Sequence, residues 1–251
     1  MARRTNNSSF MAQRAETTSR QSGSADHEQN ERGGEAFDRR RGPDGRRQKT
    51  GAAIGAACQA LIEAEEELTE MDRATGDGDL GASMRRAAMA VRNTMDSYPL
   101  TNVAATLKAL GHDLQREMGG SSGPLYGVFF LRCGNVLESS RTSGLAQWVE
   151  AVDQGCQAVS ELGGAKPGDR TMLDALAPFV KSLKDARGEL SREILLTAVE
   201  AAERGAKATA QMKPRLGRSS YLGDRVLGHP DPGAKAVAIW LRAASEALFP
   251  L

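Results

Sequence analysis

The stretch from residue 51 to residue 83 reads GAAIGAACQALIEAEEELTEMDRATGDGDLGAS, and it decides the expected fold. Its first part carries apolar residues at helical spacing, so that they share one face: Ile54, Cys58, Leu61, Ile62 and Leu68. The pattern then stops at a turn that combines glycines with acidic residues, GDGDLG at residues 76–81. A helix that leads into such a turn indicates that the loops between helices do the binding.

The helical pattern continues to the end of the chain. Further helical stretches are expected near residues 82–96, 102–117, 123–139, 144–161, 170–184, 190–212 and 232–249. With the first stretch, this makes about eight helices. Strand signals are nearly absent, because Val, Ile and Thr clusters with an alternating pattern do not recur. The sequence therefore predicts an all-α fold.

Charge divides the chain into two parts. Residues 1–50 hold 11 Lys and Arg against 7 Asp and Glu, whereas the remainder holds 22 against 25. The first part is rich in Ser, Gly, Asn, Gln and Arg and cannot bury enough apolar surface to offset its ordering entropy. We therefore expect a disordered basic leader over residues 1–50 and a folded domain over residues 51–251. Its arginine run is typical of a solvated tail, so nucleic acid is not an expected partner.

The cysteines and the apolar runs favour a cytoplasmic protein. Cys58, Cys133 and Cys156 are far apart and lie in apolar helical patterns, so they are expected to be buried thiols in a reducing compartment. Membrane binding is not expected, because no stretch approaches the roughly 20 apolar residues that span a bilayer.

Three aspartates surround the first glycine turn. Asp72, Asp77 and Asp79 lie at positions n, n+5 and n+7, and carboxylates this close repel one another unless a cation neutralises them. On a flexible turn they can converge on one point, and oxygen ligands of this kind suit Mg²⁺ or Ca²⁺. The alternative is an Asx-turn in which Asp79 caps a helix that begins at Gly81. The local sequence supports the two interpretations equally.

Two further glycine turns precede apolar helices. GGSSGP at residues 119–124 could bind phosphate through the backbone N–H groups of a helix N-terminus, although it is also an ordinary helix start. PGDRTMLD at residues 167–174 indicates a helix start, with Asp169 as the N-cap and Met172 in the first turn.

A long glycine-punctuated segment follows at residues 217–233. Arg218 and Arg225 could bind phosphate oxygens, because a guanidinium offers a fork of donors. His229 could serve as an acid or base, but a lone His beside prolines is more often structural. The chain has neither a GxxxxGK[ST] phosphate loop nor a GxGxxG turn, so phosphate binding would depend on metal and helix N-termini.

These four segments, in this order, resemble the L subunit, or DAK2 domain, of dihydroxyacetone kinases. The matching phrases are LTEMDRATGDGDLG, GGSSGPLYGVFF, PGDRTMLDALAP and GRSSYLGDRVLGHPDPGA. The resemblance implies a barrel of eight up-and-down antiparallel helices, with the nucleotide held by the loops at one end.

The resemblance also implies a set of site residues. Asp72, Asp77 and Asp79 correspond to the ligands of two Mg²⁺ ions that hold the phosphates of ATP or ADP. The implied nucleotide contacts are Leu80, Gly81, Ala82, Ser83, Ser121, Ser122, Gly163, Met172, Arg218, Asp231, Pro232 and Gly233. Arg218 is also the implied catalytic cation. Leu80 and Ser83 depart from the histidine and asparagine that are common at these positions, which would alter affinity without removing a metal ligand.

The family's mechanism requires a partner. Its ketose substrate is held by a separate K-type domain or subunit, and no phrase here resembles that domain. The donor is either exchangeable ATP or a bound ADP that a phosphohistidine carrier protein rephosphorylates, and Leu80 leans towards ATP. A different class is a non-catalytic, nucleotide-bound regulatory or sensor module. The oligomeric state is left open, with a homodimer as one alternative.

Overall fold

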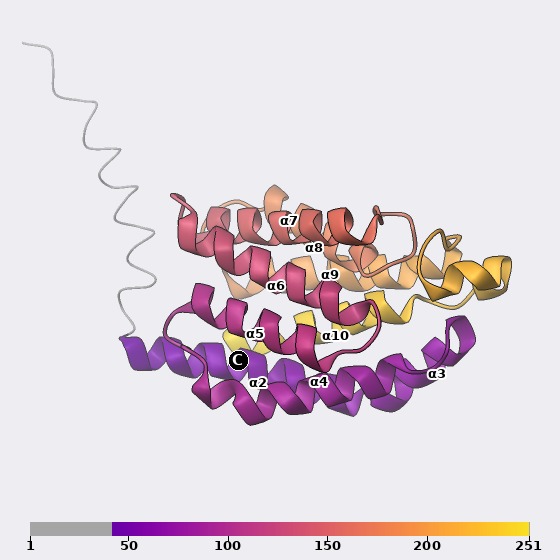
Figure 1. Ribbon diagram of the computed structural model, residues 1–251. Coiled ribbons are helices and arrows are strands. Elements are labelled where there is room, and N and C mark those ends of the chain that lie inside the picture. The colour runs from indigo at the N-terminus through magenta and orange to yellow at the C-terminus, as the bar shows by residue number, and fades with distance from the viewer. Residues whose placement is uncertain (1–41, 251) are drawn as a thin grey trace, which may run out of the picture.

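The computed structural model describes residues 42–250, and the regular structure in that range is helical (Figure 1). Its α-helices are α2 (Pro43–Glu63), α3 (Glu65–Thr75), α4 (Leu80–Thr94), α5 (Val103–Glu117), α6 (Ser122–Ser139), α7 (Gly144–Gly163), α8 (Leu173–Asp185), α9 (Arg192–Ala208) and α10 (Pro232–Leu248). Short 3₁₀ segments are η1 (Met95–Ser97), η2 (Thr209–Gln211) and η3 (Arg218–Val226). The predicted all-α class is confirmed for the described residues.

The first helix differs from the prediction at both ends. It begins at Pro43 rather than Gly51, so residues 43–50 are helical and do not belong to a disordered leader. Proline at the first helical position is preset for helix and needs no N–H partner there, and the Lys49 ammonium donates to the Leu248 carbonyl at 3.0 Å. The expected single stretch is also divided at Ala64, where α3 follows α2. The rest of the predicted leader, residues 1–41, lies outside the described residues.

The helices pack in chain order. Each helix from α4 to α10 packs against the next one, and α10 returns to pack against α2, which also packs against α4. This order of neighbours supports the expected barrel of eight helices, with α2 and α3 as one kinked member. The barrel itself stays a prediction. Short connections join most neighbouring helices, which therefore run in opposite directions, and the longer segment between Ala208 and Pro232 joins α9 to α10 (Figure 1).

Aliphatic and aromatic side chains fill the space between the helices. Phe129 and Phe130 of α6 meet Trp240 of α10, with ring centroids 6.2 Å and 5.6 Å from the indole. Leu68, Leu173 and most of the other buried apolar residues form a contiguous core around them. A second, smaller cluster contains Cys58, Val91 and Tyr98. Cys58 and Cys133 are buried free thiols, as expected, whereas Cys156 is a free thiol that is only half-buried. Among the described helices, none combines the length and apolar character that crossing a bilayer requires.

Alternation of direction places four connections at one end of the molecule. Because neighbouring helices run in opposite directions, every second connection lies at the same end. Four connections lie there: the α3–α4 turn, the α5–α6 turn, the α7–α8 loop and the α9–α10 segment. Figure 1 shows the end of α3 and the segment before α10 at this same end. The four glycine-rich phrases of the sequence coincide with these four connections.

Glycines allow α5 and α6 to approach closely. A Cβ at Gly111 would lie 3.0 Å from the Gly127 carbonyl oxygen, and one at Gly134 would lie 2.7 Å from the Ala104 carbonyl oxygen. Backbone atoms of a packed helix cannot move aside cheaply, so a methyl group at Gly134 would push the two helices apart.

We expect Gly134→Ala to lower the free energy of unfolding by about 1–3 kcal/mol, the usual effect of overpacking. Gly55→Ala is the matched control, because a Cβ there meets only the Met95 methyl at 3.9 Å. In an open helix interior this change should raise stability by about 0.5–1 kcal/mol. Urea denaturation followed by circular dichroism measures both changes, and equal stability of the two variants would contradict the packing argument.

Candidate metal and nucleotide site

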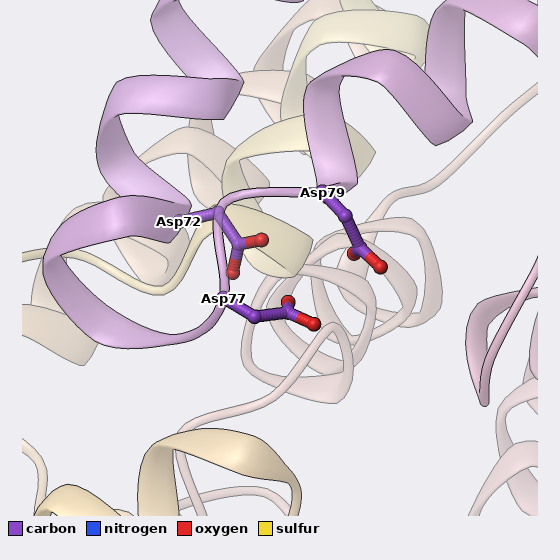
Figure 2. A group of neighbouring side chains, drawn as sticks. All are labelled: Asp72, Asp77 and Asp79. Atoms are coloured by element: carbon purple, nitrogen blue, oxygen red, sulfur yellow. The ribbon is translucent and has the colours of Figure 1, made fainter.

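The three predicted metal-binding aspartates converge at the α3–α4 turn. Asp72 lies in the last turn of α3, and Asp77 and Asp79 follow on the loop (Figure 2). One carboxylate oxygen from each lies within 4.8 Å of the corresponding oxygens of the other two. Asp72 is buried, whereas Asp77 and Asp79 are exposed, so the group is open to solvent on one side.

Glycines in the turn make this convergence sterically feasible. A Cβ at Gly76 would collide with the Asp72 carboxylate, and Gly78 adopts a φ of 77°, in the left-handed region that favours glycine. A Cβ at Gly78 would also lie 2.6 Å from the Arg73 side chain. The two glycines that separate the aspartates therefore have a structural reason to be glycines.

Helix capping does not account for Asp79. The residue stands at the N-cap of α4, but its side chain accepts no capping hydrogen bond. The Leu80 N–H donates instead to Asp72 Oδ2 at 3.1 Å, so Asp72 serves the helix N-terminus from the neighbouring helix. The capping alternative is wrong for Asp79, because its carboxylate is not used at the helix N-terminus. The metal role of the three aspartates stays a prediction.

The residues present fit a hard divalent cation. Three clustered carboxylates provide oxygen donors, and their number leaves coordination positions for water or phosphate oxygens, as Mg²⁺ prefers. A closed calcium loop would need further ligands, above all a bidentate glutamate, which the sequence lacks at the turn.

Arg218 is the basic residue that meets this acidic group. Its Nη1 forms ion pairs with Asp77 and with Asp79, the latter at 3.3 Å. The guanidinium also lies 3.5 Å from where a Cβ of Gly120 would be. Arg218 thus brings the start of η3, the α3–α4 turn and the α5–α6 turn together. Arg225, the second arginine considered for phosphate, is exposed and forms no ion pair within residues 42–250.

The predicted contacts beside the aspartates fall at the first turn of α4. Gly81 is buried against α3, where a Cβ would lie 2.8 Å from the Thr69 backbone nitrogen. Ala82 is exposed, Leu80 packs partly into the core, and Ser83 is buried with its hydroxyl 3.4 Å from Arg86 Nη2. Close packing against α3 therefore explains glycine at position 81, independently of any contact with a nucleotide.

The serine hydroxyls of the α5–α6 turn form no capping hydrogen bond with α6. Ser121 precedes α6 without a side-chain capping bond, and Ser122 is the first residue of the helix. Gly120 has a φ of 61°, and a Cβ there would lie 3.5 Å from Arg218 Nη2. Gly163, the last residue of α7, lies against the first turn of α6, with its Cβ position 3.1 Å from Leu125.

The segment before α8 differs from the sequence interpretation. Asp169 was expected as the N-cap, but α8 begins at Leu173, and the Asp169 carboxylate accepts from the Lys166 N–H at 2.8 Å instead. Asp174 binds the Thr171 N–H at 2.8 Å. Met172, a predicted nucleotide contact, is 6% exposed and belongs to the core. The turn uses its carboxylates to organise its own backbone, which the motif alone does not reveal.

The Asp-Pro helix start before α10 forms as expected. Asp231 Oδ2 accepts from the Ala234 N–H at 2.8 Å, the Asp231 N–H donates to Thr209 Oγ1 at 2.7 Å, and Pro232 begins the helix. Burial raises the pKa of the Asp231 carboxyl to about 6, although the Ala234 N–H and the positive charge of Arg170 act against this. The nearby carboxylates of Asp174 and Asp72 add to the increase. One of the three clustered aspartates, Asp72, therefore acts electrostatically on Asp231.

Sequence reasoning missed Arg170. It is 1% exposed, and its Nη2 donates to the His229 carbonyl at 2.8 Å. His229 contributes this backbone oxygen while its side chain is exposed. An arginine within a Pro-Gly-Asp turn carries no sequence signal for burial, since arginines are mostly exposed.

Comparisons with known proteins cover most of the described chain. The sequence model of the family described as "DAK2 domain" matches residues 74–246, starting two positions after Asp72. The chain is 40% identical over 194 residues to the triokinase/FMN cyclase of Homo sapiens, and this match covers 76% of this chain and 33% of that protein. It is 36% identical over 188 residues to the Escherichia coli "PEP-dependent dihydroxyacetone kinase, ADP-binding subunit DhaL", spanning 74% of this chain and 90% of that one.

A solved structure gives the same match. The crystal structure of the C. freundii dihydroxyacetone kinase in complex with AMP-PNP and Mg²⁺ superimposes with a TM-score of 0.65 at 32% identity. The match covers 78% of this chain and 33% of that one. The chain thus spans about a third of the length of the larger kinases, and nearly all of DhaL.

The raised pKa of Asp231 predicts a pH dependence of stability in the metal-free protein. The unfolded carboxyl titrates near 3.8 and the folded one near 6, so between these values the folded state holds a proton that the unfolded state has lost. The contribution of Asp231 to the free energy of unfolding should therefore fall by about 2 kcal/mol as the pH rises from about 4 to about 7, and it should be level above that range.

Asp231→Asn is the matched comparison, because Asn keeps an oxygen for the Ala234 N–H and cannot ionise. Urea denaturation in EDTA across this pH range measures both proteins. The stability of the Asn variant relative to the parent should increase as the pH rises. A constant difference would show that Asp231 titrates as an ordinary surface carboxyl.

Proposed function

Because the chain belongs to the DAK2 domain family, we propose that it binds a magnesium–nucleotide complex and transfers a phosphoryl group as part of a dihydroxyacetone-type kinase. The observation that carries this proposal is the convergence of the three carboxylates at an open turn. Support comes from relatives whose names state kinase activity and ADP binding, and from the AMP-PNP and Mg²⁺ in the C. freundii structure.

Asp72, Asp77 and Asp79 would hold two Mg²⁺ ions against the nucleotide phosphates. Bound Mg²⁺ would neutralise the charge that develops on the phosphoryl oxygens. Asp72 already has one oxygen committed to the Leu80 N–H, which fixes its orientation before any ligand arrives. Asp77 and Asp79 are exposed, so their side chains would adjust to the ion and the phosphates once Arg218 leaves them.

Arg218 would change partners when the site fills. Its guanidinium now neutralises Asp77 and Asp79, and a cation on those carboxylates would release it. Phosphate oxygens accept the same planar fork of donors, so the released guanidinium could turn to the phosphates and stabilise the transferring group. This exchange would allow one residue to balance the charge of the free site and to act as the catalytic cation of the filled one.

Helix N-termini would complete the phosphate and adenine contacts. The first turn of α4, residues 80–83, and Ser121 with Ser122 at the start of α6 both face the end of the molecule where Arg218 lies. Gly163 lies against the first turn of α6, and the Asp231–Pro232–Gly233 turn begins α10 at the same end. Backbone N–H groups at such positions attract anions.

The acceptor hydroxyl would come from a separate substrate-binding protein of the K type. The match covers 90% of the length of a subunit that is named for ADP binding, whereas larger relatives such as the triokinase/FMN cyclase extend well beyond the match. A phosphohistidine carrier protein is a further partner if the donor is bound ADP. The reduced thiols of Cys58, Cys133 and Cys156 suit the cytoplasm, which we propose as the location.

Removing one carboxylate should weaken Mg²⁺-dependent nucleotide binding. We expect Asp77→Ala to raise the Kd for ADP at least about tenfold in Mg²⁺, because a charged ligand to the ion is lost. In EDTA the two proteins should bind equally weakly. Asp96→Ala is the control, since Asp96 is an exposed acid beyond the other end of α4, about 20 Å away. Equal affinities of parent and Asp77→Ala in Mg²⁺, measured by isothermal titration calorimetry, would reject the proposal.

Kinase activity should require an added partner. With a K-type subunit and dihydroxyacetone, we expect turnover from ATP, or from a phosphohistidine carrier if ADP remains bound through extensive dialysis. Loss of nucleotide on dialysis would point to ATP as an exchangeable substrate. Tight Mg²⁺-dependent binding with no turnover from either donor would contradict the kinase role and favour a nucleotide-bound regulatory module.

A further inference from the structure

Arg170 is a buried cation between two connections of the site. It lies in the α7–α8 loop with a side chain that is fully screened from solvent, and it reaches the turn before α10, 59 residues further along the chain. Its backbone has a φ of 63°, and no other non-glycine residue within 42–250 has a positive φ. Such a conformation persists where the surrounding structure holds the residue in place.

The contacts of the guanidinium are directed at one turn. Nη2 donates to the His229 carbonyl at 2.8 Å, and Nη1 lies 3.8 Å from Asp231 Oδ1. Nε and Nη1 have no hydrogen-bond partner among residues 42–250. A buried guanidinium with incomplete hydrogen bonding is unfavourable for stability, and an apolar side chain of similar size would pack at least as well. Packing alone therefore gives a poor account of arginine at this position.

The electrostatic setting explains the choice of a cation. The negative charges of Asp174 and Asp72 act against ionisation of the Asp231 carboxyl, and the positive charge of Arg170 favours it. Asp231 also holds the first turn of α10 through the Ala234 N–H. Without a cation the Asp231 carboxylate would be buried beside two others of the same sign, and its hold on the turn would weaken.

We propose that Arg170 is a positioning residue for the nucleotide site, which fixes the Asp231–Pro232–Gly233 turn by binding the His229 carbonyl and facing the Asp231 carboxylate. The nucleotide part of this inference rests on the proposed function. Arg170 would act through the turn and would not touch the nucleotide itself, because its side chain is enclosed.

Three variants test the role. Arg170→Met removes the charge and both contacts while keeping much of the volume. Arg170→Lys keeps the charge but cannot donate a planar fork. Arg215→Met is the control, because Arg215 pairs at 3.3 Å with Asp169, the neighbour of Arg170, but its side chain is 75% exposed.

Two measurements are made on each protein. Hydrogen exchange reports the turn directly, because the Gly228, Asp231 and Ala234 amides are all hydrogen-bonded there. Calorimetric titration with ADP and MgCl₂ reports binding. For Arg170→Met we expect faster exchange over residues 228–236, unchanged exchange in α5 and α6, and at least about tenfold weaker ADP binding. Arg170→Lys should recover part of the slow exchange at the turn and part of the ADP affinity. Arg215→Met should equal the parent in both measurements.

Opposite results would overturn the inference. One such result is a folded Arg170→Met protein in which the exchange rates at the turn and the affinity for ADP both equal those of the parent. Uniformly faster exchange in every helix with unchanged affinity would also do so, because it indicates a general packing role. If Arg170→Met does not fold, Arg170→Lys decides, since parental exchange at the turn in that variant would likewise contradict the proposal.

Failure of the proposed function would look different. In that case the parent protein itself would not bind ADP with MgCl₂, while the exchange measurement would still show whether Arg170 holds the turn.

Discussion

Mutual repulsion among Asp72, Asp77 and Asp79 is the constraint on which the rest of the site depends. Carboxylate oxygens within 4.8 Å of one another repel by about 1–3 kcal/mol per pair, depending on the local dielectric. The chain nevertheless holds them together, with Gly76 and Gly78 shaping the turn and Asp72 bound to the N-terminus of α4. A fold that concentrates negative charge in this way requires a positive partner, and Arg218 meets two of the three groups.

The helical framework explains why that partner can arrive from so far along the sequence. Alternating helices send every second connection to the same end, so the start of η3 meets a turn that lies about 140 residues earlier. The same geometry brings the α7–α8 loop against the turn before α10, where Arg170 and Asp231 form a second, buried pair of opposite charges. One pair is exposed and exchangeable, and the other is enclosed and fixed. The first suits ligand binding, and the second suits positioning.

The positions of most helices and of the turns between them could be predicted from the sequence, because helical periodicity and glycine turns are local signals. The helices between residue 80 and residue 250 lie close to their predicted ranges, and the Asp231 cap forms as the Asp-Pro pair indicates. The start of α2 was missed because residues 43–50 are polar and lack an apolar stripe. Asp169 was misassigned because a carboxylate that binds loop amides has the same local sequence as an N-cap.

Contacts between distant residues could not be read from the sequence. Nothing in the sequence around Arg170 distinguishes it from a solvated arginine, and its burial depends on the α7–α8 loop closing over the turn at His229. The pairing of Arg218 with Asp77 and Asp79 likewise depends on how the helices are arranged. The convergence of the three aspartates could be predicted because their spacing is local, whereas the pairing of Arg218 with two of them could not.

The central claim is that the clustered carboxylates gather divalent cations that hold a nucleotide, and anomalous diffraction tests it most directly. Crystals grown with Mn²⁺ in place of Mg²⁺ and with AMP-PNP would be measured at the manganese edge. The account predicts anomalous peaks between Asp72, Asp77 and Asp79, next to the phosphates, with the Arg218 guanidinium moved off the carboxylates. Well-ordered AMP-PNP with no manganese among these three side chains, and Arg218 still paired to Asp77, would contradict it.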